Sequence, residues 1–215
     1  MRVLVTRPEP GASATAARLV AMGHEPVLAP CLAITPLRAK LPEAPAALVI
    51  TSGQAIAALP ENLHEVPAFC VGDATAAKLR AAGFVRVESA AGNAQDLFRL
   101  VTARRVPGVH LLAVGERQGL ALARQLREAG VSVLRRKVYA VHPLRQLPET
   151  VGVEAALFYS AESARAFVRL KPAGTGAVTA YALSQNVADA LIDLPWREIR
   201  VALAPTEADL MALMA

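Results

Sequence analysis

The chain has 215 residues, of which 54% are hydrophobic and 19% are charged, and its formal net charge is +5. This composition is typical of a globular protein and excludes an intrinsically disordered one. No apolar run approaches the roughly 18–20 residues that a membrane-spanning helix needs, and Arg7 interrupts the first apolar stretch where a secretion signal would stay apolar. We therefore expect a cytoplasmic protein with no membrane partner.

The basic balance of the chain favours an anionic partner. Single-strand binders stack bases on aromatic side chains and duplex binders need a continuous basic face, whereas this chain is poor in aromatic residues (4%) and its arginines are scattered. Only Arg104–Arg105 and Arg135–Lys137 are clustered, and we interpret both clusters as solvated surface rather than as a nucleic-acid site. Cys31 and Cys70 form no metal or redox motif, so we expect two buried free thiols and no metal site.

Short runs that are apolar on both faces alternate along the chain with segments of helical spacing. Such runs predict strands of parallel sheets covered by helices on both faces, which is an α/β fold. The clear runs are Val3–Val5, Ala47–Ile50, Phe69–Val71, Leu111–Val114, Ala155–Tyr159, Val178–Ala182 and Val201–Leu203. Weaker strands are expected at Pro26–Ala29, Val85–Glu88 and Val131–Leu134. Between them, residues 120–130 predict a helix that buries Leu122, Leu126 and Ala129 and ends at Gly130.

The chain contains an internal repeat. Residues 1–32 match 109–140, residues 46–59 match 155–168, and residues 68–101 match 177–214. Each complete set would give five strands, the number in a flavodoxin-like sheet. Two arrangements remain open: sequential domains split near residue 105, or a first domain built from both chain ends with the middle part inserted. The Pro-ended extended segments 28–37 and 135–144 favour the insertion, because they can pair as a two-stranded hinge.

Polar residues follow the predicted strands at their carboxyl ends, where open parallel sheets bind ligands. The segments are Thr6-Arg7-Pro8, Thr51–Gln54, Gly72–Thr75, Gly115–Arg117, Ser160–Ser163 and Ser184–Asn186. Each precedes a predicted helix, so we expect each to supply an N-cap. Together, six helix N-termini would present backbone N–H groups suited to a multiply charged anion held between two domains.

Other catalytic motifs are missing from the sequence. The four histidines are isolated, there is no GxxxxGK[ST] phosphate loop, and there is no GxSxG nucleophile motif. The segment 174–180 (GTGAVTA) precedes a predicted strand instead of following one, which disfavours a nucleotide loop. The residues therefore favour neither cofactor chemistry nor a catalytic triad.

The chain carries seven short motifs: VTRPEP (5–10), VITS (49–52), VGDATAAKLRAAGF (71–84), GNAQDL (92–97), KVYAVHP (137–143), FYS (158–160) and APTEADL (204–210). In this order and spacing the chain resembles the uroporphyrinogen-III synthases over essentially its whole length. The resemblance implies two flavodoxin-like domains, each a five-stranded parallel sheet flanked by helices, joined by a two-stranded linker. The implied domains are 1–34 plus 144–215 and the inserted 38–136, with linker strands at about 30–37 and 137–143.

The resemblance also implies the activity. Members of the family are cofactor-free lyases of tetrapyrrole (porphyrin, haem) biosynthesis, which cyclise hydroxymethylbilane with loss of water and inversion of ring D to give uroporphyrinogen III. The implied partner is this small tetrapyrrole with its several carboxylates, and no metal or organic cofactor is implied. We expect a monomer, and the resemblance leaves open a transient contact with the preceding deaminase.

Functional residues are carried over position by position. Tyr139 matches a tyrosine proposed to assist departure of the substrate hydroxyl group. Thr51, Ser52, Gly72, Thr75 and Ser160 match positions that bind acetate and propionate groups. We add Arg7, Asn93, Gly115, Ser184 and Asn186 as candidate substrate-binding residues. The chain departs from the family at Ser184–Ala188, where a Gly-Pro-Thr-Thr-Ala-like segment is common, so threonine contacts are not transferred there.

Two other functions fit parts of the sequence. A non-catalytic binding module for acidic small molecules would use the same helix N-termini without turnover. A sugar or nucleotide-sugar transferase is disfavoured, because the sequence shows no acidic metal-binding motif and no coherent nucleotide loop.

Overall fold

In a computed structural model, which describes residues 1–148 and 152–214, the chain divides into two compact units. Unit 1 contains residues 1–33 and 142–215, and unit 2 contains residues 34–141. Unit 1 is therefore assembled from both ends of the chain. No helix in the described ranges is long and apolar enough to cross a membrane.

Unit 1 is built on a five-stranded parallel sheet in the order β11-β10-β9-β1-β2. Its strands are β1 (Arg2–Val5), β2 (Glu25–Leu28), β9 (Ala155–Phe158), β10 (Thr179–Ala182) and β11 (Glu198–Val201). Helices α1 (Gly11–Ala21) and α7 (Glu207–Ala212) pack on one face through Leu19 and Leu210. On the other face, Phe158 packs against Phe167 of α5 (Ala161–Arg169), and α6 (Gln185–Asp189) follows β10.

Unit 2 is built on a six-stranded sheet in the order β3-β8-β7-β4-β5-β6. Its strands are β3 (Leu32–Pro36), β4 (Ala47–Ile50), β5 (Ala68–Cys70), β6 (Val87–Ser89), β7 (His110–Gly115) and β8 (Val133–Pro143). The short 3-10 helices η1 (Gly53–Ala58) and η2 (Glu61–Leu63) and helix α2 (Asp73–Ala81) pack on one face. Helices α3 (Ala94–Arg104) and α4 (Leu120–Glu128) pack on the other.

The two sheets share one strand order. Numbered along the chain, sheet 1 reads 5-4-3-1-2, which is the flavodoxin-like order. Without β3, sheet 2 has the same order when β7 and β8 take the places of β1 and β2. The predicted class, two flavodoxin-like sheets, is therefore confirmed, with one correction: sheet 2 has six strands because β3 adds to its edge.

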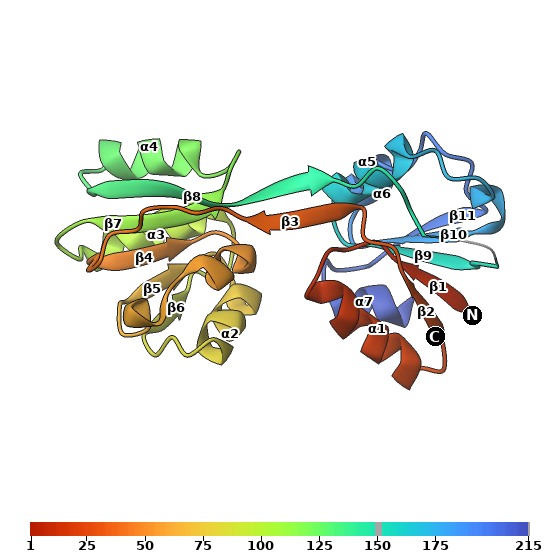
Figure 1. Ribbon diagram of the computed structural model, residues 1–215, viewed down its shortest axis with the longest axis horizontal. Helices are drawn as coiled ribbons and strands as arrows, with labels where there is room; N and C mark the ends of the chain where they lie inside the picture. The colour runs from red at the N-terminus through yellow and green to blue at the C-terminus, as the bar shows by residue number, and fades with distance from the viewer. Residues whose placement is uncertain (149–151, 215) are drawn as a thin grey trace. The chain divides into compact units, whose positions relative to one another are not determined.

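Strand β3 pairs with β8, and Figure 1 shows the two running in opposite directions. Leu37 N donates to Val138 O at 2.8 Å, and Leu144 N donates to Cys31 O at 2.9 Å. These bonds extend along the segments where the chain passes from one unit to the other, at residues 33–34 and 141–142. The predicted pairing of two extended, Pro-ended segments is thus present.

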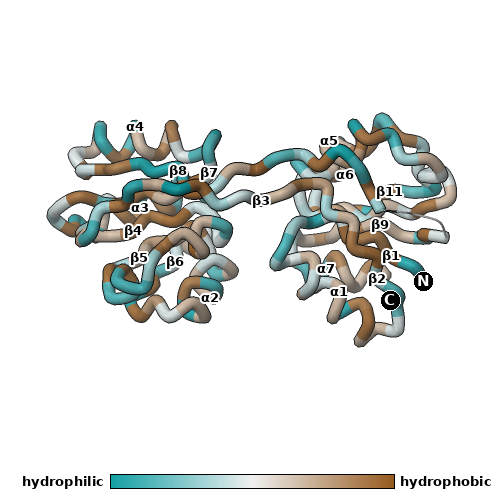
Figure 2. The backbone as a smooth tube through the Cα atoms, viewed as in Figure 1, coloured by the Kyte–Doolittle hydropathy of each residue, from teal (hydrophilic) through white to brown (hydrophobic). Residues whose placement is uncertain are grey.

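The central strands are apolar because both of their faces are covered. All four residues of β4 are fully buried: Leu48 and Ile50 pack toward α2, while Ala47 and Val49 pack toward α3 and α4. Strand β1 buries Val3, Leu4 and Val5 in the same way, and both strands appear as hydrophobic stretches in Figure 2. This two-sided burial is what produces uninterrupted apolar runs in place of alternation.

Two predicted details are wrong. The buried face of α4 consists of Leu122, Ala123 and Leu126, and Ala129 is exposed because the helix ends before it, at the left-handed Gly130 (φ 81°). The last strand ends at Val201, and Leu203 is 96% exposed. The residues of this strand that pair with β10 end at Val201, and although Ala202 N still donates to Ala182 O, Leu203 lies beyond the sheet.

Candidate functional site

The carboxyl edge of sheet 2 collects most of the predicted site residues. Thr51 and Ser52 follow β4, Gly72–Thr75 follows β5, and Gly115 ends β7 opposite Tyr139 of β8. Because these strands are parallel, their carboxyl ends meet at the same edge. The structure therefore brings these residues, which are far apart in sequence, to one side of unit 2.

Tyr139 is held in one orientation by its neighbours. Its side chain is buried, and its hydroxyl donates to Gln118 Oε1 at 2.8 Å. Gly115 makes room for the ring, since a Cβ at this position would lie 2.8 Å from Tyr139 Cε2. Glu116 N donates to Tyr139 O at 2.9 Å, which fixes the loop after β7 against β8. Gln118 itself is exposed, so the buried tyrosine hydroxyl is separated from solvent by the loop that carries this residue.

Arg135 braces the same loop. Its guanidinium donates to Gln118 O at 2.7 Å and to Glu116 O at 3.0 Å. Two carbonyls that would otherwise need water are thereby satisfied. Arg135 lies at the surface, as predicted for the Arg135–Lys137 cluster, and there it stabilises this loop.

Thr51 and Ser52 differ in how their hydroxyls are used. Ser52 is the N-cap of η1, and its Oγ accepts from Gln54 N at 3.3 Å. Thr51 Oγ1 is buried and has no hydrogen-bond partner among the described residues. A buried hydroxyl without a partner costs about 1–3 kcal/mol, so such a group in a native protein calls for an explanation. Thr51 Oγ1 is thus a candidate donor or acceptor for a ligand at this edge.

Two helix N-termini at this edge are capped differently. Gly72 is the N-cap of α2 and has no side chain with which to accept from the first N–H groups, so no side chain caps this helix. Asn93 is the N-cap of α3 and forms a complete capping box with Asp96, whose side chain accepts from Asn93 N at 2.9 Å. Each helix carries a carboxylate in its first turn, Asp73 in α2 and Asp96 in α3, but only in α3 do side chains bond the N-terminal N–H groups, which leaves α2 as the better anion site of the two. Asn93 is explained by capping alone.

The N-cap prediction holds at some strand ends and is wrong at others. Ser160 caps α5, accepting from Ser163 N at 3.1 Å, and Ser184 occupies the N-cap position of α6 without a side-chain bond. Asn186 lies exposed in the first turn of α6. After β1 and β7 the loops are longer than predicted, so Pro10 and Gly119 take the N-cap positions expected of Thr6-Arg7-Pro8 and Gly115–Arg117. Buried Thr6 instead donates to Leu157 O at 2.6 Å.

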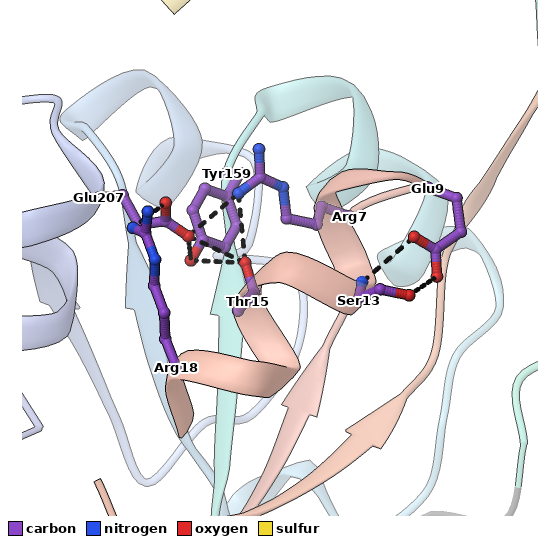
Figure 3. A network of polar contacts seen from close by, with 7 residues as sticks. All are labelled: Arg7, Glu9, Ser13, Thr15, Arg18, Tyr159 and Glu207. Carbon is purple, nitrogen blue, oxygen red and sulfur yellow. Dashed lines mark hydrogen bonds and ion pairs between the residues drawn. The ribbon is translucent and has the colours of Figure 1, made fainter. Parts of the chain in front are cut away.

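Arg7 belongs to a polar network at the carboxyl edge of sheet 1 (Figure 3). Its Nη1 donates to Glu207 Oε1 and to Thr15 Oγ1, both at 3.2 Å. Its guanidinium carbon lies 4.0 Å above the centre of the Tyr159 ring, and the Tyr159 hydroxyl donates to Glu207 Oε1 at 3.0 Å. Burial raises the pKa of Tyr159 to about 12. Arg18 pairs with the other oxygen of Glu207.

Sequence reasoning missed Glu207. Its partners in the network come from the loop after β1, from α1 and from the end of β9, and Arg7 lies 200 residues away from it. The only sequence signal was its place in the APTEADL motif at the start of the last helix. No local spacing connects that helix to Arg7.

The described residues contain no group of three or more His, Cys, Asp or Glu side chains that could hold a metal ion. Cys31 and Cys70 are free and buried, as predicted, and burial raises the pKa of the Cys31 thiol to about 12. These thiols are therefore poor ligands and poor nucleophiles at neutral pH.

Two cavities lie at the opposite, amino edges of the sheets. One, of about 420 Å³ in unit 1, is apolar and is bounded by Phe167 and Trp196. The other, of about 520 Å³ in unit 2, is bounded by His110 and Arg105. Neither contains a predicted site residue, so we do not assign them to the site at the carboxyl edges.

Comparisons with known proteins agree on one family. A family model, uroporphyrinogen-III synthase HemD, matches residues 13–212. The structure is similar to that of uroporphyrinogen-III synthetase from Helicobacter pylori, with a TM-score of 0.67 and 19% identity over 100% of this chain and 98% of the other. It is also similar to a mutant uroporphyrinogen III synthase from Thermus thermophilus, with a TM-score of 0.53 and 19% identity over 100% and 97% of the two chains. Sequence comparison with curated proteins gives no significant match.

Proposed function

Because the chain belongs to the uroporphyrinogen-III synthase family, we propose that the residues at the carboxyl edges of its two sheets bind and turn over the substrate of that family. The enzyme is a lyase of tetrapyrrole biosynthesis, which cyclises hydroxymethylbilane to uroporphyrinogen III with loss of water and inversion of ring D. The observation that carries this conclusion is the family match over residues 13–212, which include every candidate site residue except Arg7. No observation favours the non-catalytic binding module.

Tyr139 is our candidate for assisting the first chemical step. In that step the bond between the terminal carbon of hydroxymethylbilane and its hydroxyl oxygen breaks, and the oxygen leaves as water after gaining a proton. A phenol with an ordinary pKa near 10 is a weak acid at neutral pH, so hydrogen bonding or proton transfer from it gives modest assistance. The hydrogen bond from Tyr139 to Gln118 Oε1 places the hydroxyl beside the exposed Gln118, and the hydroxyl hydrogen must leave Gln118 Oε1 to reach the substrate oxygen.

The carboxylates of the substrate are proposed to bind the N–H groups and hydroxyls of these edges. In unit 2 the donors are Thr51, Ser52, Thr75 and the N-terminus of α2 behind Gly72. In unit 1 they are Arg7, Ser160 and Ser184. A helix N-terminus contributes only about 0.3–1 kcal/mol to binding one anion, so several of them must act on one multiply charged ligand. We assign weaker roles to Asn93 and Asn186, since the first is a cap and the second lies within α6.

We further propose that the protein acts as a monomer in the cytoplasm. Membership of the family supports this proposal. Size-exclusion chromatography with light scattering would test the monomer, and a dimer mass would contradict it.

An isomer assay tests the function directly. Freshly generated hydroxymethylbilane closes on its own to the type I isomer, so the purified chain should divert the product to type III. The two isomers are separated chromatographically, with heat-denatured protein as the matched control. Type I alone from a well-folded sample would refute the synthase assignment.

Ionic strength tests the binding mode. Added salt shortens the Debye length to roughly 8 Å at 0.15 M and 3 Å at 1 M, so the KM for hydroxymethylbilane should rise with salt while kcat changes little. A KM that is independent of salt would contradict binding through the substrate carboxylates.

A further inference from the structure

The polar network around Arg7 joins four separate parts of unit 1. Arg7 lies in the loop after β1, Thr15 and Arg18 lie on α1, Tyr159 follows β9, and Glu207 is the first residue of α7. Figure 3 shows their side chains converging on the Glu207 carboxylate. The network therefore connects the last helix of the chain to the carboxyl edge of sheet 1.

Glu207 is the centre of this network. Its Oε1 accepts from Arg7 Nη1 (3.2 Å), from Thr15 Oγ1 (2.9 Å) and from the Tyr159 hydroxyl (3.0 Å), and its Oε2 accepts from Arg18. The side chains of Arg7 and Glu207 are only 25% and 24% exposed, so solvent screens their attraction less than it would on an open surface. Two arginines face one carboxylate, and the cluster keeps a net positive charge.

The guanidinium of Arg7 is fixed on three sides. Nη1 is used by Glu207 and Thr15, the Tyr159 ring lies beneath the guanidinium, and Gly11 lies beside it. A Cβ on Gly11 would be only 2.5 Å from Arg7 Nε, so the close approach depends on the glycine. One terminal nitrogen of Arg7 points away from the other network residues in Figure 3. The side chain is thus ordered before a ligand arrives, with one donor still directed outward.

We propose that Glu207 is a positioning residue for substrate binding: it holds Arg7 in the orientation in which the outward nitrogen of the guanidinium binds a substrate carboxylate. This inference rests on the proposed role of Arg7 in substrate binding. A side chain that is already ordered loses less freedom on binding than a mobile one, which is the physical benefit of the network. Arg7 and Gly11 lie outside the residues matched by the family model, so this assignment depends on the structure.

A purely structural role for Glu207 makes a different prediction. If Glu207 only fixed α7 against α1, its loss would lower stability whether or not Arg7 were present. If it positions Arg7, its effect on KM must disappear when Arg7 is absent. A double-mutant cycle separates the two, because it measures the coupling between the two side chains.

The experiment compares the wild type, Glu207→Gln, Arg7→Gln and the double variant in the type III isomer assay. Glu207→Gln should raise KM about five- to tenfold, as expected when an ordered side chain becomes mobile, and leave kcat within about twofold. In the Arg7→Gln background, Glu207→Gln should change KM less than about twofold. Glu25→Gln is the matched control, because Glu25 pairs with Arg2 at 3.1 Å near the amino edge of the same sheet, and it should leave KM unchanged.

Several outcomes would overturn the proposal. Glu207→Gln makes the cluster more positive. A lower KM would therefore mean that the charge of the cluster affects substrate binding more than the orientation of Arg7 does. An equal rise in KM in both backgrounds would show that Glu207 acts independently of Arg7. An unchanged KM for Arg7→Gln would show that Arg7 does not bind the substrate, so Glu207 would have no binding residue to position. Formation of type I alone by the wild type would instead refute the synthase assignment itself.

A second variant covers the case in which Glu207→Gln does not fold. Thr15→Val removes one donor to Glu207 and one acceptor for Arg7 but keeps both charges. It should raise KM about threefold at unchanged kcat, and again only when Arg7 is present. Equal effects with and without Arg7 would overturn the proposal.

Discussion

The two sheets share one strand order, but the polar groups at their carboxyl edges differ in how they are hydrogen-bonded. In unit 1 the charged groups are bonded to one another, since Glu207 accepts from two arginines and two hydroxyls. In unit 2 the edge keeps an unmatched buried hydroxyl at Thr51 and an α2 N-terminus without a side-chain cap. One topology can therefore provide a pre-ordered charged donor in one copy and neutral donors in the other.

Both edges use a glycine to admit the key side chain. Gly11 lies against Arg7, and Gly115 lies against the Tyr139 ring. Neither glycine has a positive φ, so space and not backbone conformation explains its presence. Because each edge has its own glycine, a substitution at one glycine tests one edge and leaves the other edge unchanged.

The largest expected effect is that of Tyr139→Phe. Removing the hydroxyl should lower kcat about 100-fold, the low end of what a positioned general acid contributes, and leave the affinity for the product nearly unchanged. Single-turnover formation of the type III isomer measures the chemical step. An unaltered rate would remove Tyr139 from the mechanism and leave unit 2 with a binding role only.

Substitutions at the two glycines should affect different kinetic constants, kcat at Gly115 and KM at Gly11. Gly115→Ala would bring a Cβ to 2.8 Å from the Tyr139 ring and should lower kcat about tenfold, because small displacements of a reacting group are costly. Gly11→Ala would displace the Arg7 guanidinium and should mainly raise KM. Gly176→Ala is the control, since its Cβ would meet only an ordinary contact at 3.7 Å. If both site variants changed the same constant, the functional difference between the edges would be lost.

Thr51→Val should separate stability from binding. Replacing an unmatched buried hydroxyl by an isosteric apolar group should leave the free energy of unfolding unchanged or raise it by about 1 kcal/mol, while KM rises about threefold. Thr6→Val is the comparison in unit 1: it removes a 2.6 Å bond to Leu157 O and should lower the free energy of unfolding by about 1 kcal/mol. Urea denaturation gives both values, and a loss of stability in Thr51→Val would mean that its hydroxyl is satisfied in solution.

A further expected effect is a pH dependence in unit 1, which appears only in alkaline solution. Burial raises the pKa of Tyr159 to about 12 in the folded state, above its usual value near 10. The folded state therefore holds this proton more tightly, and the resulting stability is fully present below about pH 10 and lost as the pH rises toward 12. The difference in unfolding free energy between wild type and Tyr159→Phe should shrink over that range.

Cys31 also has a raised pKa of about 12, but it is present in both proteins and cancels in the comparison. A difference that stays constant between pH 10 and 12 would show that Tyr159 has an ordinary pKa.

Much of the fold could be predicted because it depends on local patterns. The runs at Val3–Val5 and Ala47–Ile50 are apolar on both faces, and both are buried central strands. Strand ends were less predictable where an edge strand is half exposed, as at Val201, because its last pairing residue depends on its neighbour β10. The same limit explains Ala129, whose exposure depends on where α4 ends.

The candidate site could be predicted only in part. The position of Thr51 and Gly72 at a carboxyl edge follows from the strand pattern, because parallel strands place those ends together, whereas Tyr139 was indicated only by the family resemblance. The partners of these residues do not follow from it. Gln118 meets Tyr139 because the loop after β7 folds back on β8, which no local spacing encodes.

By itself, the sequence determined the α/β class, the repeated unit and the loops at the carboxyl ends of the strands, since apolar periodicity and turn residues act over a few neighbouring positions. Only the tertiary structure decided that Arg7 contacts Glu207, 200 residues away, and that the Tyr139 ring packs against Gly115. Such pairings depend on which helix packs over which strand, and that is settled by packing of the whole unit.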